Sequence, residues 1–346
     1  MSGFGEAITV TRKARGMTQA ELAEAVGVSQ AAINRHEAGL REPDDETLDK
    51  IAAALEVTPR FLRHGDRFVG ALAVDAHMRR QKTTKASVWR KLEAELNLLR
   101  LHSALLFSEV SIAAEQMVPT FDPLETTPED AARFVRAQWR LPIGPVVNLT
   151  RRLEAAGCLV FTADFGTPRV DGLSQWSGDH PLILVNETLP ADRLRLTLAH
   201  ELGHLCLHTL GPTEDMEREA NRFAAEFMMP EDVIRHDLRR PDTGTLLDLK
   251  REWGVSMQAL YERAYQLGRV SPTERQHFYK MLNARGWKTV EPGQERVPRE
   301  EPELPRHIGK ALHERGLADD EINSLAGAVH TERNPFSYQS RRLRAV

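Results

Sequence analysis

The sequence predicts a mainly helical α+β protein, with one small β-sheet near the middle of the chain. Three observations support this fold class. Apolar residues recur at helical spacing over most of the 346 residues, between residues that commonly begin or end helices. Two short runs rich in branched and aromatic residues, 157–163 and 181–186, are typical of strands instead. The content of hydrophobic residues, 41%, and of charged residues, 28%, is ordinary for a globular protein.

Charge and cysteine content exclude several classes of protein. The formal net charge of −4 gives the whole chain no general attraction for nucleic acid. No run of 18 apolar residues is present, so no membrane-spanning helix is expected. The first residues lack the basic and apolar character of a signal sequence, which predicts a cytoplasmic protein. The two cysteines, Cys158 and Cys206, predict no disulfide framework and fit a reducing compartment.

Length and changes in composition predict four segments along the chain. A chain of 346 residues is expected to hold two or three domains. The predicted segments are a five-helix domain (1–65), a linker with a long helix (66–127), a central domain with the sheet (128–270), and a helical carboxyl-terminal region (271–346). The long helix is expected over 84–117, where it either mediates dimerisation or lies across the central domain. The Pro- and Glu-rich stretch 292–305 is expected to be a mobile linker.

A helix-turn-helix is predicted in the first domain. Thr18, with Glu21 three residues later, forms a capping box that begins one helix, and Gly27 supplies a tight turn. Ser29 begins the next helix, whose Ile33 is expected to be buried. Residues 18–37, with the segments 37–43 and 48–57, closely resemble the lambda-repressor-like (XRE) family. The alternative is a helical protein–protein module of the same fold.

The second helix of such a motif enters the major groove of double-stranded DNA by its first turns. The residues expected to contact bases lie at its start, and two others are expected at phosphates. The candidate base readers are Gln30, Ala31, Asn34 and Arg35, and the phosphate-contacting pair is Gln19 and Arg41. Ser29, which begins the helix, is also included among the expected DNA-binding residues. Residues 1–64 contain eight Lys and Arg against ten Asp and Glu, which departs from the usual basic footprint. We therefore expect a homodimer to be needed for useful affinity.

A second motif lies in the central domain. His200, Glu201 and His204 form the pattern H-E-x-x-H inside an apolar helix. The two histidines are one turn apart and project from one face, so both can reach a single zinc ion. Glu201 is then placed to hold and deprotonate a water molecule. The alternative for these residues is an ordinary charged face of an amphipathic helix.

The following helix offers the third zinc ligand that a peptidase requires. Glu217 is favoured, because it shares a face with small residues, and Asn221 one turn later is expected to support a ligand histidine. Glu219 is the rival ligand, although it faces a different direction from Glu217. The alternative for Glu217 is a solvated surface charge. His208, one turn beyond His204, is expected to support the ligands or to be structural.

The segments 181–186, 195–205, 217–225 and 229–230 resemble the ImmA/IrrE metallopeptidases in order and spacing. With the first domain, residues 1 to about 270 are similar to XRE regulators fused to such a domain. The resemblance implies a gluzincin-like zinc endopeptidase, with ligands at His200, His204 and a downstream glutamate and with Glu201 as general base. Some members of this family cut a helix-turn-helix repressor.

The main functional hypothesis is a DNA-binding transcription regulator, active in a stress response, that hydrolyses a peptide bond of a regulatory protein. An edge strand of the sheet is expected to align the peptide, with Trp176 either lining the cleft or packed in the core. The residue that stabilises the oxyanion is left open among His180, His208, His236 and Tyr261. The alternatives are a transcription factor whose metal domain senses a signal without proteolysis, and a toxin–antitoxin or phage-defence component.

Overall fold

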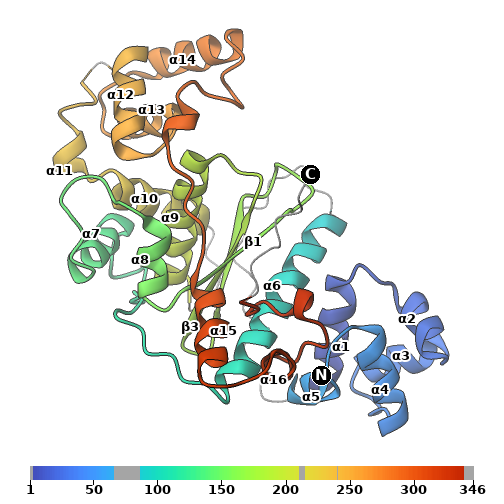
Figure 1. Cartoon of the computed structure of the whole chain (residues 1–346). Helices are drawn as coiled ribbons and strands as arrows, with labels where there is room; N and C mark the ends of the chain where they lie inside the picture. Colours follow the sequence, from blue (N-terminus) through green and yellow to red (C-terminus); the bar gives the residue numbers. More distant parts are fainter. Residues whose placement is uncertain (1–2, 66–85, 210–214, 240, 339–346) are drawn as a thin grey trace, which may run out of the picture.

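The computed structural model describes residues 3–65, 86–209, 215–239 and 241–338 (Figure 1). Helices dominate these ranges, and three short strands form a single sheet within them, which confirms the predicted α+β class. The helices α1–α5 lie at one end of the molecule and α12–α14 at the other, with the sheet and α6 between them (Figure 1). The linker 66–76, the basic stretch 79–85 and the basic tail 341–344 lie outside the described residues.

The first domain contains the five predicted helices: α1 (Gly3–Ala14), α2 (Gln19–Val26), α3 (Gln30–Glu37), α4 (Asp45–Ala54) and α5 (Pro59–Arg63). The local signals act as expected. Thr18 and Glu21 form a capping box at α2, and Ser29 accepts a hydrogen bond from the amide of Ala32 at α3. Gly27 ends α2 with φ of 76°, a conformation that glycine adopts without strain.

Helix α6 (Ala86–Phe107) is shorter than the predicted 84–117, since residues 108–117 are not helical. The hydroxyl of Ser108 donates to the carbonyl of Leu105, and the branched residues Val110 and Ile112 that follow are poor helix formers. One side of α6 packs into the core of α1–α5, and the other side covers the sheet. Of the two expected roles, α6 therefore lies across the central domain, and it joins that domain to the first.

The sheet has the strand order β1-β3-β2, from β1 (Leu159–Ala163), β2 (Gly172–Ser177) and β3 (His180–Asn186). Strand β1 is parallel to β3, and β2 is antiparallel to β3. Two of the strands match the predicted runs. The third, β2, was not predicted, because its polar and small residues lack the usual strand composition.

Helices cover both faces of this sheet. One face packs against α9 (Ala191–Leu207), and the core extends to the helices that surround it. These helices are α7 (Pro128–Gln138), α8 (Leu149–Ala155), α10 (Met216–Met228), α11 (Glu231–Ile234), α12 (Thr243–Trp253), α13 (Met257–Gln266) and α14 (Pro272–Ala284). The predicted boundary at residue 270 falls between α13 and α14, which share this core.

The carboxyl-terminal region returns across the molecule through η2 (Gln294–Arg296), α15 (Leu304–Glu314), α16 (Asp319–Ala326) and η3 (Thr331–Arg333). The stretch 292–305, predicted to be mobile, is held by specific hydrogen bonds. Glu300 accepts one from the amide of Thr150 at 2.7 Å, and Arg299 donates one to the carbonyl of Leu189 at 2.7 Å. Charged residues of this segment, whose Pro and Glu content suggested disorder, therefore hold it in place. No described helix is long and apolar enough to cross a membrane.

Candidate metal centre

Helices α9 and α10 approach each other closely because Gly203 has no side chain. A Cβ at this position would lie 3.1 Å from Cδ1 of Phe223 and 3.2 Å from Cα of Ala220. Nearly every residue of the second half of α9 is buried, so its polar side chains are directed by packing on all sides. This close approach brings the start of α10 beside the face of α9 that carries His200 and His204.

Three side chains converge between these helices. Nε2 of His200 lies 3.1 Å from Nε2 of His204, and the carboxylate of Glu217 lies 3.6 Å and 3.5 Å from these two atoms. Neither carboxylate oxygen of Glu217 accepts a hydrogen bond from a described residue, although both are buried. One donor atom from each residue lies within 4.8 Å of the others, which is a geometry that can hold a metal ion. Two imidazoles and one carboxylate form a donor set that suits zinc and leaves a position open.

A series of side-chain contacts runs from His204 through His208 to Glu219. Nδ1 of His208 lies 3.0 Å from Nδ1 of His204, and Nε2 of His208 lies 2.9 Å from Oε2 of Glu219. Burial lowers the pKa of His208, while the contact with Glu219 acts in the opposite direction. These contacts fix the ring of His204 with its Nε2 directed at His200. Glu219, the rival ligand, is therefore placed in a supporting position, and Glu217 occupies the centre.

Asn221 is placed differently from what we expected. Its side chain is exposed, and its amide donates a hydrogen bond to the carbonyl of Glu217 at 2.6 Å. It makes no described contact with His200 or His204. One helical turn separates Asn221 from Glu217, so its short side chain reaches the backbone of its own helix more easily than a ring on α9. The supporting contact to a histidine comes from His208 instead.

Glu201 lies on the side of α9 that faces strand β2. Its carboxylate is buried, and the hydroxyl of Ser174 donates a hydrogen bond to Oε2 at 2.7 Å. A Cβ on Gly172 would lie 3.2 Å from Oε1 of Glu201 and 2.9 Å from Cγ2 of Thr197, so glycine provides the space for this carboxylate. Burial raises the pKa of Glu201 to about 8, and the bond from Ser174 partly opposes this.

Ser174 and Gly172 were not predicted from the sequence as site residues. The available signal was the alternation of a strand, which places Gly172, Ser174 and Trp176 on one face. Recognising β2 as a strand would have directed all three towards the helix with His200. No strand was predicted for this segment, so the alternation was not used.

Strand β2 is the edge of the sheet on the side of Glu201. The amide of Asn186 donates to the carbonyl of Asp171 at 2.9 Å, which fixes the hydrogen-bonded pairs of the antiparallel ladder. In such a ladder alternate residues direct both peptide groups away from the partner strand. Gly172, Ser174 and Trp176 therefore direct their backbone N–H and C=O groups to the edge where no described strand pairs with β2.

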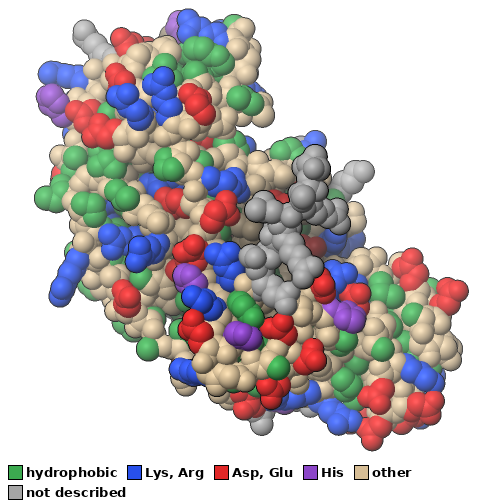
Figure 2. Space-filling model, viewed as in Figure 1, with side chains coloured by type: hydrophobic (Ala, Val, Ile, Leu, Met, Phe, Trp, Pro, Cys, Tyr) green, Lys and Arg blue, Asp and Glu red, His purple; other side chains and the backbone are tan. Residues whose placement is uncertain are grey.

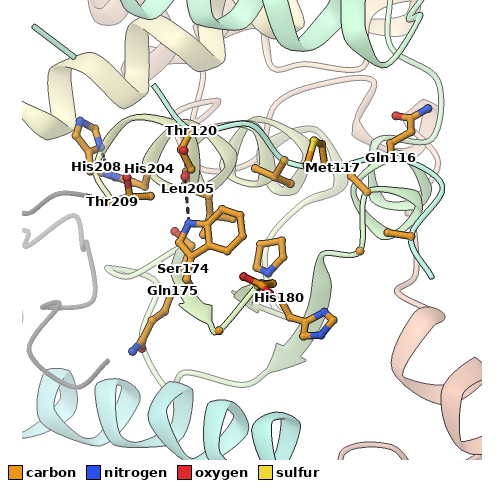
Figure 3. Close-up of a pocket in the computed structure, with 18 of the residues that line it drawn as sticks. Gln116, Met117, Thr120, Ser174, Gln175, His180, His204, Leu205, His208 and Thr209 are labelled. Atoms are coloured by element: carbon orange, nitrogen blue, oxygen red, sulfur yellow. Dashed lines mark hydrogen bonds between the residues drawn. The ribbon is translucent and has the colours of Figure 1, made fainter. Parts of the chain in front are cut away.

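A cavity of about 830 Å³ adjoins this edge and reaches His204 and His208 (Figure 3). Trp176 lines it, and its indole Nε1 donates to the carbonyl of Leu205 at 3.1 Å. The ring also packs against the main core, so both alternatives for Trp176 hold in part. The described residues around the cavity come from β2, the β2–β3 turn, the start of β3, α9 and the residues that follow it, and the segments 112–120 and 156–157.

The four candidates for the oxyanion-stabilising residue occupy different environments. His180 lines the cavity and lies opposite His204 and His208 in the view of Figure 3. Tyr261 is buried and stacked on Phe278, with ring centroids 3.9 Å apart. The side chain of His236 is 90% exposed and lies beside Asp237. His180 and His208 are thus the two that adjoin the cavity.

The first turns of α3 present the predicted base-reading side chains to solvent. Gln30, Ala31, Asn34 and Arg35 are all exposed, while the hydroxyl of Ser29 is engaged in capping the helix. Arg41 is also exposed. Acidic side chains are prominent on the visible face of α1–α5, in agreement with the charge count (Figure 2).

Gln19, predicted to lie at a phosphate, has a hydrogen-bond partner within its own domain. Its amide nitrogen donates to Oε2 of Glu37 at 2.7 Å. Glu37 is buried and also pairs with Arg12, whose Nη2 lies 2.9 Å from the same oxygen. Gln19 therefore belongs to a buried polar group that joins α1, α2 and α3, which is a structural role that the sequence pattern did not indicate.

Comparisons with known proteins agree with this division of the chain. Residues 153–265 match the family model described as the IrrE N-terminal-like domain, a peptidase M78 family, and residues 11–62 match a helix-turn-helix model. Two curated relatives come from Bacillus subtilis. The uncharacterized HTH-type transcriptional regulator YqaE is 35% identical over 63 residues, which are 18% of this chain and 54% of that protein.

The second relative is the SPbeta prophage-derived uncharacterized HTH-type transcriptional regulator YonR. It is 34% identical over 62 residues, which are 18% of this chain and 57% of that protein. This chain thus spans a little over half the length of either relative. It joins an XRE-like helix-turn-helix domain at its amino-terminal end to an IrrE N-terminal-like domain of the peptidase M78 family.

Proposed function

We propose that this chain is a DNA-binding regulator whose central domain is a zinc endopeptidase acting on a regulatory protein. The observation that carries the proposal is the convergence of His200, His204 and Glu217, with the carboxylate of Glu217 buried and without a hydrogen-bond donor. These three residues would hold zinc. Bound zinc supplies the Lewis acidity that makes water a nucleophile near neutral pH.

Other residues around this centre would transfer the proton, position Glu201 and align the substrate. Glu201 takes a proton from the attacking water and delivers it to the leaving amine. Ser174 holds Oε2 of Glu201 and leaves Oε1 for this proton transfer. The open edge of β2 offers the peptide groups of Gly172, Ser174 and Trp176 to an extended substrate, which would add to the sheet as a further strand.

The test compares the wild-type protein with Glu201→Gln in cells and in purified form. We expect protein fragments that accumulate with the wild type to be missing with Glu201→Gln, while both bind close to one zinc per chain. Glu217→Gln should lose both the zinc and the cleavage. Cleavage that persists in zinc-loaded Glu201→Gln would exclude Glu201 as the base.

The first domain would bind double-stranded DNA as part of a homodimer, through the exposed start of α3. Support comes from the capped α2–turn–α3 geometry and from the exposure of Gln30, Asn34 and Arg35. Arg35→Ala should weaken operator binding, with a loss of about 1–3 kcal/mol if the side chain contacts a base. Lys50→Ala on α4 serves as a control. Equal affinities of the wild type and Arg35→Ala would contradict this placement of the DNA.

A metal sensor without proteolysis is the second candidate, and contacts between β2 and α6 favour it. Nε2 of Gln175 lies 3.3 Å from Oδ1 of Asn97, and the hydroxyl of Ser177 donates to the carbonyl of Arg100 at 3.2 Å. Helix α6 packs in turn against α1 of the DNA-binding domain. Mobility-shift assays of DNA binding by Glu201→Gln, run with zinc and with chelator, separate the two functions. A large difference in DNA affinity between the two conditions would support sensing, because this variant cannot cleave.

A further inference from the structure

We propose that the cavity beside Trp176 is a subsite that selects a bulky apolar side chain of the polypeptide substrate, next to the bond that is cut. This inference rests on the proposed endopeptidase function. The cavity begins at His204 and His208 and extends along the end of β2 (Figure 3). A side chain that enters it therefore belongs to a residue close to the zinc-binding group.

Fixed apolar surfaces form the middle of the cavity. Trp176 is held by its bond to the carbonyl of Leu205, and Pro181, its partner in the β2–β3 ladder, lies beside it. The opposite wall is the segment after α6, where Met117 is 64% exposed and Val118 is buried. An immobile indole and a flexible thioether suit a large apolar side chain. The indole offers a rigid apolar surface, and the thioether of Met117 can adapt its shape to the side chain that enters.

The charges around the cavity favour the same guest. None of the described lining residues is Lys or Arg, and the one carboxylate among them is Asp179, which is exposed in the β2–β3 turn. A charged substrate side chain in the cavity would thus lose hydration, and Asp179 is the one carboxylate among the described lining residues that could offer it an opposite charge. Apolar side chains such as those of Phe, Leu, Met and Trp avoid this cost.

The edge of β2 would determine which residue of the substrate faces the cavity. A peptide that pairs with the open edge beside Ser174 and Trp176 alternates its side chains between the two faces of the sheet. One of these faces is the face of Trp176 and of the cavity. A single position of the substrate would therefore show the apolar preference, while its two neighbours would not.

The experiment is a digest of a mixed peptide library by the zinc-loaded protein, with the cleavage sites read by mass spectrometry. The expected result is enrichment of Phe, Leu, Met or Trp at one position beside the cut bond, by about tenfold or more over Ala. Met117→Glu should shift that position towards Lys and Arg, because it places a carboxylate in the wall. Leu124→Glu is the matched control, since Leu124 is 93% exposed and does not line the cavity, and it should keep the wild-type preference.

Capture of the same library by zinc-loaded Glu201→Gln, without cleavage, provides an independent readout. Enrichment of apolar peptides that Met117→Glu alters and Leu124→Glu does not would support the subsite. Cleavage that depends on Glu201 but has no apolar preference would overturn the subsite and leave the endopeptidase intact. Absence of cleavage would overturn the proposed function, and the captured peptides would still decide the subsite, which fails if they show no apolar enrichment.

Discussion

At the scale of single residues, Gly172 controls the position of Glu201. An added methyl group would meet Cγ2 of Thr197 at 2.9 Å and the Glu201 side chain at 3.2 Å. Both neighbours are buried on α9 and have little room to move. Any adjustment therefore displaces the carboxylate or the edge strand that we propose aligns the peptide.

We predict that Gly172→Ala lowers peptide cleavage by roughly ten- to a hundredfold, because small displacements of catalytic groups have effects of this size. Zinc content should stay near that of the wild type, since the three ligand side chains are not contacted. Gly144→Ala is the matched control, as nothing lies within 4 Å of its added Cβ. Full activity of Gly172→Ala would show that Glu201 tolerates another position.

His102 is a buried titratable residue far from the metal centre. Its Nδ1 lies 2.6 Å from the carbonyl of Ala326, so it links α6 to α16. Burial lowers its pKa to about 4, the backbone bond to Ala326 opposes this, and the charge of Arg15 adds a further decrease. The residue is therefore neutral in the folded protein at pH values where the unfolded chain already binds a proton.

We predict that this residue makes the protein less stable as the pH falls from about 6.5 to about 4. The unfolded chain gains a proton over this window and the folded chain does not, so the free energy of unfolding decreases, by at most about 3 kcal/mol. His102→Asn keeps a donor for Ala326 but cannot titrate, so its urea denaturation should depend less on pH than that of the wild type. Equal pH dependence would contradict the assignment.

At the scale of elements, a buried ion-pair group fixes the start of α9. Lys250 of α12 is 1% exposed and lies 2.7 Å from Asp192 in the first turn of α9 and 2.9 Å from Glu291. Glu291 also accepts hydrogen bonds from the amides of Met257 and Gln258 at the start of α13. One lysine therefore holds together α9, α12, α13 and the returning carboxyl-terminal segment.

Lys250→Met should reduce the free energy of unfolding by about 3–5 kcal/mol, because it leaves two buried carboxylates without a counter-ion. Lys50→Met provides the comparison, since Lys50 forms an exposed pair with Glu46 on a single helix. Its effect should not exceed about 0.5 kcal/mol. Denaturant unfolding of both variants is the measurement, and similar stabilities would contradict the role given to Lys250.

The elements also show what could be predicted from the sequence. Helices α2 and α3 were predicted because Thr18, Gly27 and Ser29 act on residues close to them in the chain. The pair His200 and His204 was predicted for the same reason, since one turn of helix determines their relation. Strand β2 was missed, because its hydrogen bonds with β3 and the contact of Ser174 with Glu201 join distant residues.

The same distinction explains the segment 292–305. Its Pro and Glu content suggested a mobile linker, yet Glu300 and Arg299 bind backbone groups more than one hundred residues earlier in the chain. Asn221 and Gln19 are further cases. Asn221 was assigned from helical spacing and Gln19 from the resemblance to XRE domains. Each binds a partner, Glu217 or Glu37, that these arguments could not select.

At the scale of the whole molecule, metal binding should stabilise the fold. Zinc would hold α9 and α10 together and give the carboxylate of Glu217, which accepts no hydrogen bond from a described residue, an ion to bind. At a free zinc concentration one thousand times the dissociation constant, the stabilisation is about 4 kcal/mol. We predict that chelator lowers the melting temperature of the wild type and leaves that of Glu217→Ala unchanged. A wild-type melting temperature that ignores chelator would argue against a metal at this site.

The position of the helix-turn-helix domain depends on the carboxyl-terminal region as well as on α6. The amide of Thr58, which begins α5, donates to the carbonyl of Gly327 at 3.0 Å, and Val57 forms a β-bridge with Ala328. Gly327 has φ of 75°, and a Cβ there would lie 2.6 Å from Cδ2 of Phe61 and 2.7 Å from Cδ2 of Leu105. The carboxyl-terminal region, through Gly327 and Ala328, therefore helps to hold the first domain against the central one.

We predict that Gly327→Ala loosens this attachment without unfolding either domain. Hydrogen exchange of the α5 amides should become at least about tenfold faster, while zinc content and the exchange of α9 should stay at wild-type values. Gly316→Ala is the matched control, because Gly316 also has a positive φ, of 97°, but nothing lies within 4 Å of its added Cβ. Faster α5 exchange in both variants would mean that backbone strain, rather than the contact with Phe61 and Leu105, is responsible. Unchanged exchange in Gly327→Ala would show that α6 alone holds the helix-turn-helix domain in place.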